Sequence, residues 1–243
     1  LYRTAEVTVR ANEELGVFAG PDVSQAEFRR LCSAAADKLE KEEIEKEMRY
    51  KLGQKKIIWL KQGIPQDDSF LSGPLYENIY PKGVHGHVDE FCRFVDESTI
   101  LISSVSEQEA KEHPVYKEAK KRMDENYEIL INSTDQDGRA FRVIKVPMAP
   151  VLIHDRRAGP EKQIITSVTS YMNFIISNSL IVLPSYVSGN SGDQKLLQKE
   201  QEVGAIFKEV FPRREIIKVR ADTLNYYSGG FHCISIHEPR VNK

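Results

Sequence analysis

The chain has 243 residues, long enough for one large domain and too long for a small protein held together by disulfides. Its 34 Lys and Arg residues are balanced by 36 Asp and Glu residues, giving a net charge of −2. A protein that grips nucleic acid or an anionic membrane needs an excess of cations, so we expect neither partner. A hydrophobic content of 40% with 29% charged residues is typical of a globular chain.

Three cysteines, Cys32, Cys92 and Cys233, are too few for a framework of paired disulfides, so a reducing compartment is expected. The sequence contains no apolar run of the length that a membrane span requires and does not open on a secretion signal. We therefore predict a cytoplasmic protein. Its first residue is Leu rather than Met, as expected for a fragment of a longer chain.

The first strong signal is an amphipathic helix over residues 40–53, where apolar residues recur at every fourth position and a glycine follows. KKIIWL (55–60) has the pattern of a buried strand. The loop over 66–85 is rich in turn residues and tyrosines, and its length suits a lid or a binding loop.

The rest of the chain alternates strands with helices, and a pattern of two strands, a helix and a strand occurs twice, over 90–132 and 173–219. This indicates a structural repeat within one α/β domain. The elements predicted are strands at 85–95, 99–105, 128–132 and 141–146, helices at 106–127 and 193–211, a hairpin at 173–186 and a strand at 214–219.

The segment Gly86-His87-Val88-Asp89 is the first place where chemistry could occur. If it is a strand, His87 and Asp89 lie on one face, with His85 next to them. A histidine and a carboxylate in this arrangement suit acid–base catalysis beside a cation-binding group. Two other interpretations stay open: a solvated polar edge, and a metal site that uses the same imidazoles and carboxylate.

The glycine-rich run SGGFHCIS contains the second place, Cys233. Glycines let the backbone approach a ligand closely, and a cysteine after a turn is a candidate thiolate nucleophile. Alternatively, Cys233 is a small buried hydrophobic residue, as most free cysteines are. His232 is not an obvious base, because neighbours on a strand point to opposite faces. By the same alternation Cys92 points away from His87, so we expect it to be structural.

These two segments, in this order, resemble the agmatine deiminases and the bacterial-type peptidyl-arginine deiminases of the guanidine-modifying pentein superfamily. GHVDEFCRFV is similar to their G-H-[VI]-D block, and GGFHCISIHEP to their glycine-rich I-H-C-[IV]-T block. SYMNFIISNSLIVLPSY, FPRREIIKVRAD and KEEIEKEMRYKLGQKKIIWLKQGI resemble three further blocks, so the likeness extends over residues 38–239. It implies a pentein-type α/β propeller of strand-strand-helix-strand modules, of which this chain supplies only the later ones.

The sequence also departs from the family. Residues 1–37 match its N-terminal portion poorly, with Glu13 or Glu14 as the only acidic candidate for a substrate-binding residue there. The triplet Ser-Ile-His at 235–237 stands where Thr-Gln-Gln is usual. We expect residues 1–243 to form a single, incomplete deiminase-like domain.

The resemblance implies that Cys233 is the nucleophile that attacks the guanidino carbon, and that a protonated His87 lowers the pKa of its thiol. His87 then protonates the departing ammonia and activates the water that hydrolyses the covalent amidino-thioether. Asp89 binds the guanidinium as a charge-assisted acceptor, and Gly230 lines the substrate site. Neither a metal nor an organic cofactor is required.

The activity implied is the conversion of agmatine to N-carbamoylputrescine and ammonia, in putrescine and polyamine biosynthesis. Peptidyl-arginine is the alternative substrate of the same chemistry. A second class of function is a non-catalytic pentein that only binds a guanidino ligand, because Asp89 alone holds such a cation weakly. The partner expected is thus a small guanidino molecule or an arginine side chain, and the oligomeric state, a homo-oligomer included, stays open.

Overall fold

The computed structural model describes residues 41–83, 86–156, 163–187, 193–227 and 229–236. The chain divides into two compact units, Leu1–Ile57 and Ile58–Lys243. Cys32, His85 and the acidic residues of the N-terminal segment lie outside the described residues. The expectation of a single deiminase-like domain over the whole chain stays a prediction.

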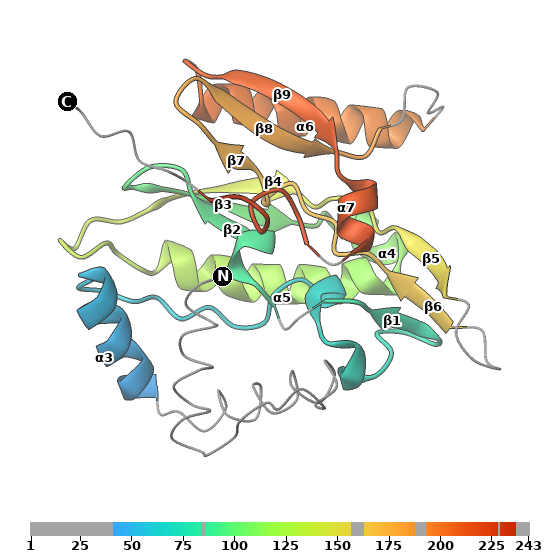
Figure 1. Ribbon diagram of the computed structural model, residues 1–243, viewed down its shortest axis with the longest axis horizontal. Helices are drawn as coiled ribbons and strands as arrows, with labels where there is room; N and C mark the ends of the chain where they lie inside the picture. The colour runs from blue at the N-terminus through green and yellow to red at the C-terminus, as the bar shows by residue number, and fades with distance from the viewer. Residues whose placement is uncertain (1–40, 84–85, 157–162, 188–192, 228, 237–243) are drawn as a thin grey trace. The chain divides into compact units, whose positions relative to one another are not determined.

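The first unit contains the helix α3 (Lys41–Leu52), which confirms the helix predicted there (Figure 1). Gly53 ends it: its N–H donates to the Arg49 carbonyl over 2.9 Å, and its φ of 64° is a conformation that glycine adopts without strain.

The strand predicted at 55–60 is wrong, because these residues form no strand with the parts of the chain that the structure describes. The side chain of Asn126 satisfies the backbone just beyond them instead. Its Oδ1 accepts the Lys61 N–H over 2.7 Å, and its Nδ2 donates to the Gln62 carbonyl over 2.9 Å. A side chain therefore takes the place of a neighbouring strand.

Two three-stranded sheets of the second unit are built alike, which confirms a repeat of two strands, a helix and a strand, although the first copy ends with β4 (Arg142–Pro147) and not at residue 132 as predicted. In each, the first two strands are antiparallel, and the third returns after a helix to lie parallel to the second. The first sheet contains β2 (Cys92–Phe94), β3 (Thr99–Ser104) and β4 (Arg142–Pro147), with helices α4 (Glu107–Glu112) and α5 (Pro114–Ile131) between the last two. The second contains β7 (Ile175–Ile176), β8 (Leu180–Ser185) and β9 (Glu215–Arg220), with α6 (Gln194–Val210) between the last two and α7 (Asp222–Tyr226) after them.

The strand predicted at 128–132 is wrong, since α5 continues to Ile131. Pro114 occupies the first turn of α5, where its missing N–H costs nothing, and Leu130 is buried in the core on the helix face. Packing of that face therefore decides the conformation of a segment whose apolar run favours a strand.

A third sheet was not predicted. It contains β1 (Ile79–Pro81), β5 (Ile153–Arg156) and β6 (Gln163–Thr166). β5 and β6 are antiparallel and β1 lies parallel to β6, so it has the same pattern as the other two sheets. Here, however, the third strand precedes the other two in the chain. The loop predicted over 66–85 thus supplies a strand, together with the short 3-10 helices η1 (Pro65–Asp67) and η2 (Phe70–Ser72).

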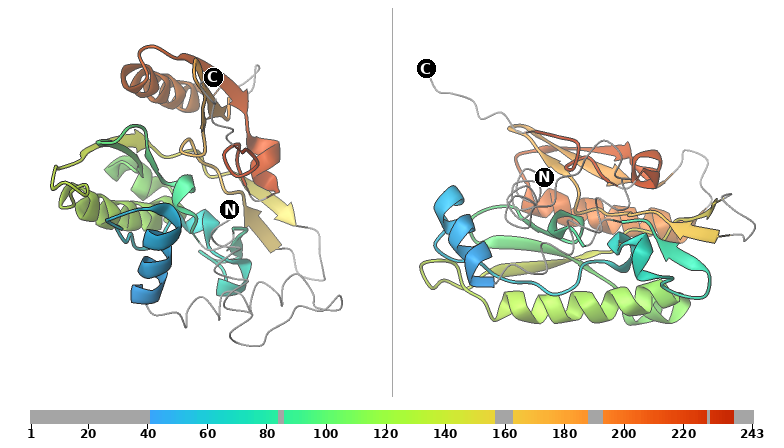
Figure 2. Two further views of the ribbon diagram at one scale, coloured as in Figure 1. Left: turned by 60° about the vertical axis from the view of Figure 1, so that its left-hand side comes forward. Right: turned by 60° about the horizontal axis from the view of Figure 1, so that its bottom comes forward.

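The helices and the first two sheets pack in layers. α5 covers one face of the β2–β3–β4 sheet (Figure 2). Ile100 and Ile102 belong to the core cluster that includes the buried residues of α5. Leu101 points to the opposite face and shares a second core with Val203 and Phe207 of α6, which also contacts β9. The alternation along β3 therefore feeds two cores, one on each side of the sheet.

Replacing Phe207 with Ala is expected to lower the free energy of unfolding by about 3–5 kcal/mol. Phe207 is 0% exposed, and its ring meets that of Phe174 edge-on at 4.8 Å between centroids, so truncation leaves a cavity. Urea denaturation measures the change. Phe94, which is 54% exposed, is the control: Phe94→Ala should cost about 1 kcal/mol or less. Equal losses in both variants would contradict this account of the core.

Among the helices in the described part of the chain, none is both long and apolar enough to cross a membrane.

Candidate active site

The segment around Asp89 is not a strand, so the reason given for placing His87 and Asp89 on one face is wrong. Val88–Glu90 forms a 3-10 turn, η3, with His87 at its start. Two backbone hydrogen bonds between residues three apart in the chain close the turn. They run from Glu90 N–H to the His87 carbonyl and from Phe91 N–H to the Val88 carbonyl, both over 3.1 Å. Hydrogen bonds within the segment therefore take the place of the hydrogen bonds to a neighbouring strand that a β-strand would make.

His87 lies beside Asp67, a residue that the sequence did not single out. The backbone N–H of His87 donates to Asp67 Oδ2, and the ring Nδ1 lies 3.9 Å from the same oxygen. Asp67 is buried, whereas the His87 side chain is 39% exposed. The structure thus gives the imidazole a carboxylate neighbour other than Asp89.

Cys233 lies in a turn over residues 231–234, and Asn173 holds this turn in place. Asn173 Oδ1 accepts the backbone N–H of His232 over 2.8 Å and that of Cys233 over 3.3 Å. The ring of His232 reaches Asp89, with Nδ1 at 2.6 Å from Oδ2. The inference that His232 points away from the site is therefore wrong, because strand alternation does not apply to a turn.

The structure brings the Cys233 sulfur and Asp89 together. Sγ lies 3.7 Å from Asp89 Oδ2, 3.5 Å from Glu90 Oε1 and 3.2 Å from Asn173 Nδ2. Sequence reasoning missed Glu90 and Asn173 as site residues. Their signals were present: Glu90 directly follows Asp89, and Asn173 is the asparagine of the YMNF block.

The electrostatics keep this thiol protonated. Burial, then Glu90 and then Asp89, raise the pKa of Cys233 to about 12. The resemblance implied the opposite direction, a pKa lowered by His87. Formation of the thiolate at neutral pH therefore requires a positive charge close to the sulfur.

The two carboxyl groups differ from each other. Burial, with Asp67 and Asp89 nearby, holds the pKa of Glu90 well above its usual range. Glu90 is 1% exposed, and its Oε2 receives no hydrogen bond from the described residues. Burial is the largest single influence on Asp89 and acts to raise its pKa, but the hydrogen bond and charge of His232, together with the charges of His87 and Arg93, outweigh it, so that this pKa is lowered. Asp89 is therefore the ionised member of the pair at neutral pH.

Gly230 packs so closely against the side chain of Asn173 that no larger residue fits at this position unless that side chain moves. A Cβ atom on Gly230 would lie 2.3 Å from Asn173 Oδ1, whereas one on Gly229 would make an ordinary contact, 3.7 Å from the Cβ of Cys233. Gly230→Ala is expected to destabilise the protein by about 1–3 kcal/mol, because the buried amide must move. Gly229→Ala is the matched control, and thermal unfolding compares the two. A melting temperature that Gly230→Ala leaves unchanged would contradict the close packing.

Cys92 is buried in the core beside β3, as predicted for a structural cysteine, and burial raises its pKa to about 12. The metal interpretation relied on His85, which lies outside the described residues, and so it stays untested; among the residues that the structure describes, no group of three or more His, Cys, Asp or Glu side chains is arranged to hold a metal ion.

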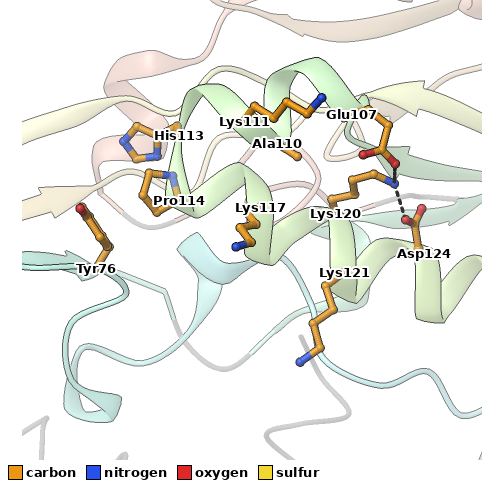
Figure 3. A pocket seen from close by; sticks show the side chains of 10 residues that line it. All are labelled: Tyr76, Glu107, Ala110, Lys111, His113, Pro114, Lys117, Lys120, Lys121 and Asp124. Carbon is orange, nitrogen blue, oxygen red and sulfur yellow. Dashed lines mark hydrogen bonds and ion pairs between the residues drawn. The ribbon is translucent and has the colours of Figure 1, made fainter.

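A separate cavity of about 790 Å³ lies along α4 and α5 (Figure 3). Lys120 bridges Glu107 and Asp124 on its wall, at 3.1 and 2.6 Å. Its other lining residues include Lys111, Lys117, Lys121 and His113, but none of the residues around the Cys233 sulfur.

Comparison with known proteins identifies the family of this chain. Residues 31–239 match the profile of the Porphyromonas-type peptidyl-arginine deiminases. The chain belongs to this family. The agmatine deiminase of Medicago truncatula is 29% identical over 214 residues, which cover 84% of this chain and 50% of that protein. The agmatine deiminase of Pseudomonas fluorescens is 26% identical over 211 residues, with 83% and 49% covered.

Solved structures of the deiminase family confirm the predicted pentein-type fold. The agmatine deiminase of Enterococcus faecalis superposes with a TM-score of 0.59 and 24% identity, over 82% of this chain and 48% of that one. The chain spans about half the length of the curated relatives it matches. The modules described above are thus one part of the fold that these deiminases have.

Proposed function

We propose that this protein is a deiminase that converts the guanidino group of agmatine to a ureido group, with release of ammonia and N-carbamoylputrescine in putrescine biosynthesis. The observation that carries the proposal is the position of Cys233 Sγ, 3.5 Å from Glu90 and 3.7 Å from Asp89. A guanidinium is planar, permanently charged and rich in donors, so carboxylates beside a thiol suit it. The family and the relatives named agmatine deiminases support this assignment.

In the proposed reaction the thiol proton of Cys233 passes to solvent, and the thiolate forms a C–S bond to the guanidino carbon as the C=N π electrons move onto nitrogen, while Asp89 holds the guanidinium nitrogens. His87 donates a proton to the departing nitrogen, which leaves as ammonia, and an amidino-thioether remains on the sulfur. The neutral imidazole then takes a proton from water, the resulting hydroxide attacks the same carbon, and the C–S bond breaks. The ureido product departs and the thiol is restored.

The substrate itself supplies the charge that this scheme needs. Burial and the neighbouring carboxyl groups of Glu90 and Asp89 raise the pKa of Cys233, so a cation bound at the ionised Asp89 offsets the negative charge beside the sulfur and lowers that pKa again. The thiolate then forms only where a guanidinium is in place to react with it. Neither a metal nor an organic cofactor takes part.

Two alternatives have specific support. The first is peptidyl-arginine as the substrate. It carries the same guanidinium, and the matched family is named for peptidyl-arginine deiminases. A non-catalytic protein that only binds a guanidino ligand is favoured by a thiol pKa of about 12, which leaves almost no thiolate at neutral pH when no cation is bound.

The test is to incubate the protein separately with agmatine and with an arginine-containing peptide, and to measure ammonia and the ureido product. We expect both products from agmatine and little from the peptide. Turnover of the peptide alone would assign the substrate to proteins. Calorimetric binding of agmatine without any ammonia would favour the non-catalytic alternative, and absence of both binding and turnover would overturn the proposal.

A further inference from the structure

Asn173 is a buried residue to which neither the family likeness nor the proposed reaction gives a role. It is 0% exposed, and its carboxamide contacts the Cys233 turn on one side and the η3 carboxylates on the other. Because Oδ1 accepts two backbone N–H groups, at His232 and Cys233, the orientation of the amide is fixed. The NH₂ group must therefore face the sulfur and the carboxylates.

The backbone around Asn173 is held as firmly as its side chain. Arg93 of β2 donates Nη1 to the carbonyls of Met172 and Phe174, over 3.2 and 3.0 Å, so it clamps both neighbours of Asn173. Ser170 Oγ donates to the Glu90 carbonyl over 2.6 Å and accepts the Met172 N–H. The amide is thus fixed to the same segment that carries the carboxylates.

The NH₂ group has more acceptors than protons. Nδ2 lies 2.9 Å from Glu90 Oε1, 3.2 Å from Asp89 Oδ2 and 3.2 Å from Cys233 Sγ, yet it carries only two N–H bonds. When a cation occupies Asp89, one of these acceptors is withdrawn and an N–H becomes free for the sulfur. A hydrogen bond to a thiolate is charge-assisted and therefore stronger than one to a thiol.

We propose that Asn173 is a positioning residue that holds the Cys233 turn against Asp89 and Glu90 and donates an N–H to the sulfur as its thiolate forms. The role in turnover rests on the proposed function, whereas the effect on the sulfur does not. In agreement, the Asn173 hydrogen bond acts to lower the pKa of Cys233, against burial and the two carboxylates. Among the described residues, Arg93 of β2 also acts on the sulfur through its charge, and the ring of His232 is bound to Asp89 beside it.

The test exchanges this amide for a group of the same shape. Asn173→Asp keeps the acceptor for the two backbone N–H groups but loses the donors. Asn126→Asp is the matched control, since Asn126 is equally buried and clamps residues 61–62 instead. Alkylation of Cys233 by iodoacetamide is followed between pH 7 and about 10 by mass spectrometry of its peptide, because the thiolate is the species that reacts. Circular dichroism checks that each variant is folded.

Alkylation of Cys233 in Asn173→Asp should be at least about tenfold slower than in the wild type at each pH, because the lost charge-assisted hydrogen bond and the new negative charge both raise the thiol pKa. Asn173→Ala adds no charge, so slower alkylation in that variant as well is what assigns the effect to the hydrogen bond. Asn126→Asp should react at the wild-type rate. If Asn173→Asp does not fold, Asn173→Ala is the second variant, with a smaller decrease expected. A folded variant at Asn173 that reacts as fast as the wild type would overturn the proposal.

Turnover of agmatine by the same variants separates this proposal from the proposed function. If the wild type is active, kcat of Asn173→Asp should fall by a much larger factor than KM changes, since the amide acts on the nucleophile and not on the substrate. An unchanged kcat would overturn the proposed role in turnover. If the wild type itself releases no ammonia, the proposed function fails, and the alkylation rates still decide whether Asn173 acts on the sulfur.

Discussion

Replacing Cys233 with Ala should reduce the release of ammonia from agmatine by at least ~10⁴-fold, since the reaction proposed here has no other atom to form the covalent intermediate. Binding of agmatine should survive, because Asp89 and Glu90 stay in place. Steady-state ammonia release measures the first effect, and calorimetry with the variant measures the second.

Cys92→Ala is the matched control. Cys92 is buried in the core, where its thiol has a pKa of about 12 and no described contact with the candidate site residues His87 and Asp89. This variant is expected to lose some stability and to keep its turnover. Full activity in Cys233→Ala would exclude covalent catalysis by this residue.

The Asp89→Asn variant should show two effects of opposite sign. It removes the ionised acceptor of the guanidinium, so kcat/KM for agmatine should fall by about 10²–10⁴-fold, mostly through KM, as expected for one or two lost charge-assisted hydrogen bonds. It also removes one of the charges that raise the pKa of Cys233, so iodoacetamide should alkylate the unliganded protein faster than it alkylates the wild type. Unfolding could also expose the thiol and abolish turnover. A melting temperature equal to that of the wild type excludes this explanation of the two effects.

Asp96→Asn serves as the control for this pair of measurements. Asp96 belongs to the turn between β2 and β3, where its Oδ1 accepts the N–H groups of Ser98 and Thr99. We expect neither KM nor the alkylation rate to change in this variant. Slower alkylation in Asp89→Asn would contradict the electrostatic account of the thiol.

The sequence predicted those elements whose pattern is long or whose partners are close in the chain. α6 carries a regular apolar face, and β7 and β8 form a hairpin, so local signals were sufficient. The strands β1, β5 and β6 are only three or four residues long, at or below the shortest run that gives a strand signal, and β1 pairs with a strand more than eighty residues later. Their pairing depends on contacts that no local pattern encodes.

The candidate site was predictable only in part for the same reason. The blocks that resemble the deiminases named Cys233, His87 and Asp89, but strand alternation gave the wrong reason for grouping them. The roles of Glu90 and Asn173 depend on a 3-10 turn meeting a loop from another sheet, some eighty residues away. Likewise, the direction of the thiol's pKa follows from burial between two carboxylates, which the order of residues along the chain does not reveal.

The most direct measurement is mass spectrometry of the protein quenched in acid during turnover of agmatine. The account predicts an amidino adduct on the peptide that contains Cys233, absent from Cys233→Ala and absent when agmatine is omitted. Release of ammonia by a protein that never carries this adduct, or an adduct on any other residue, would contradict the central claim that the Cys233 sulfur attacks the guanidino carbon.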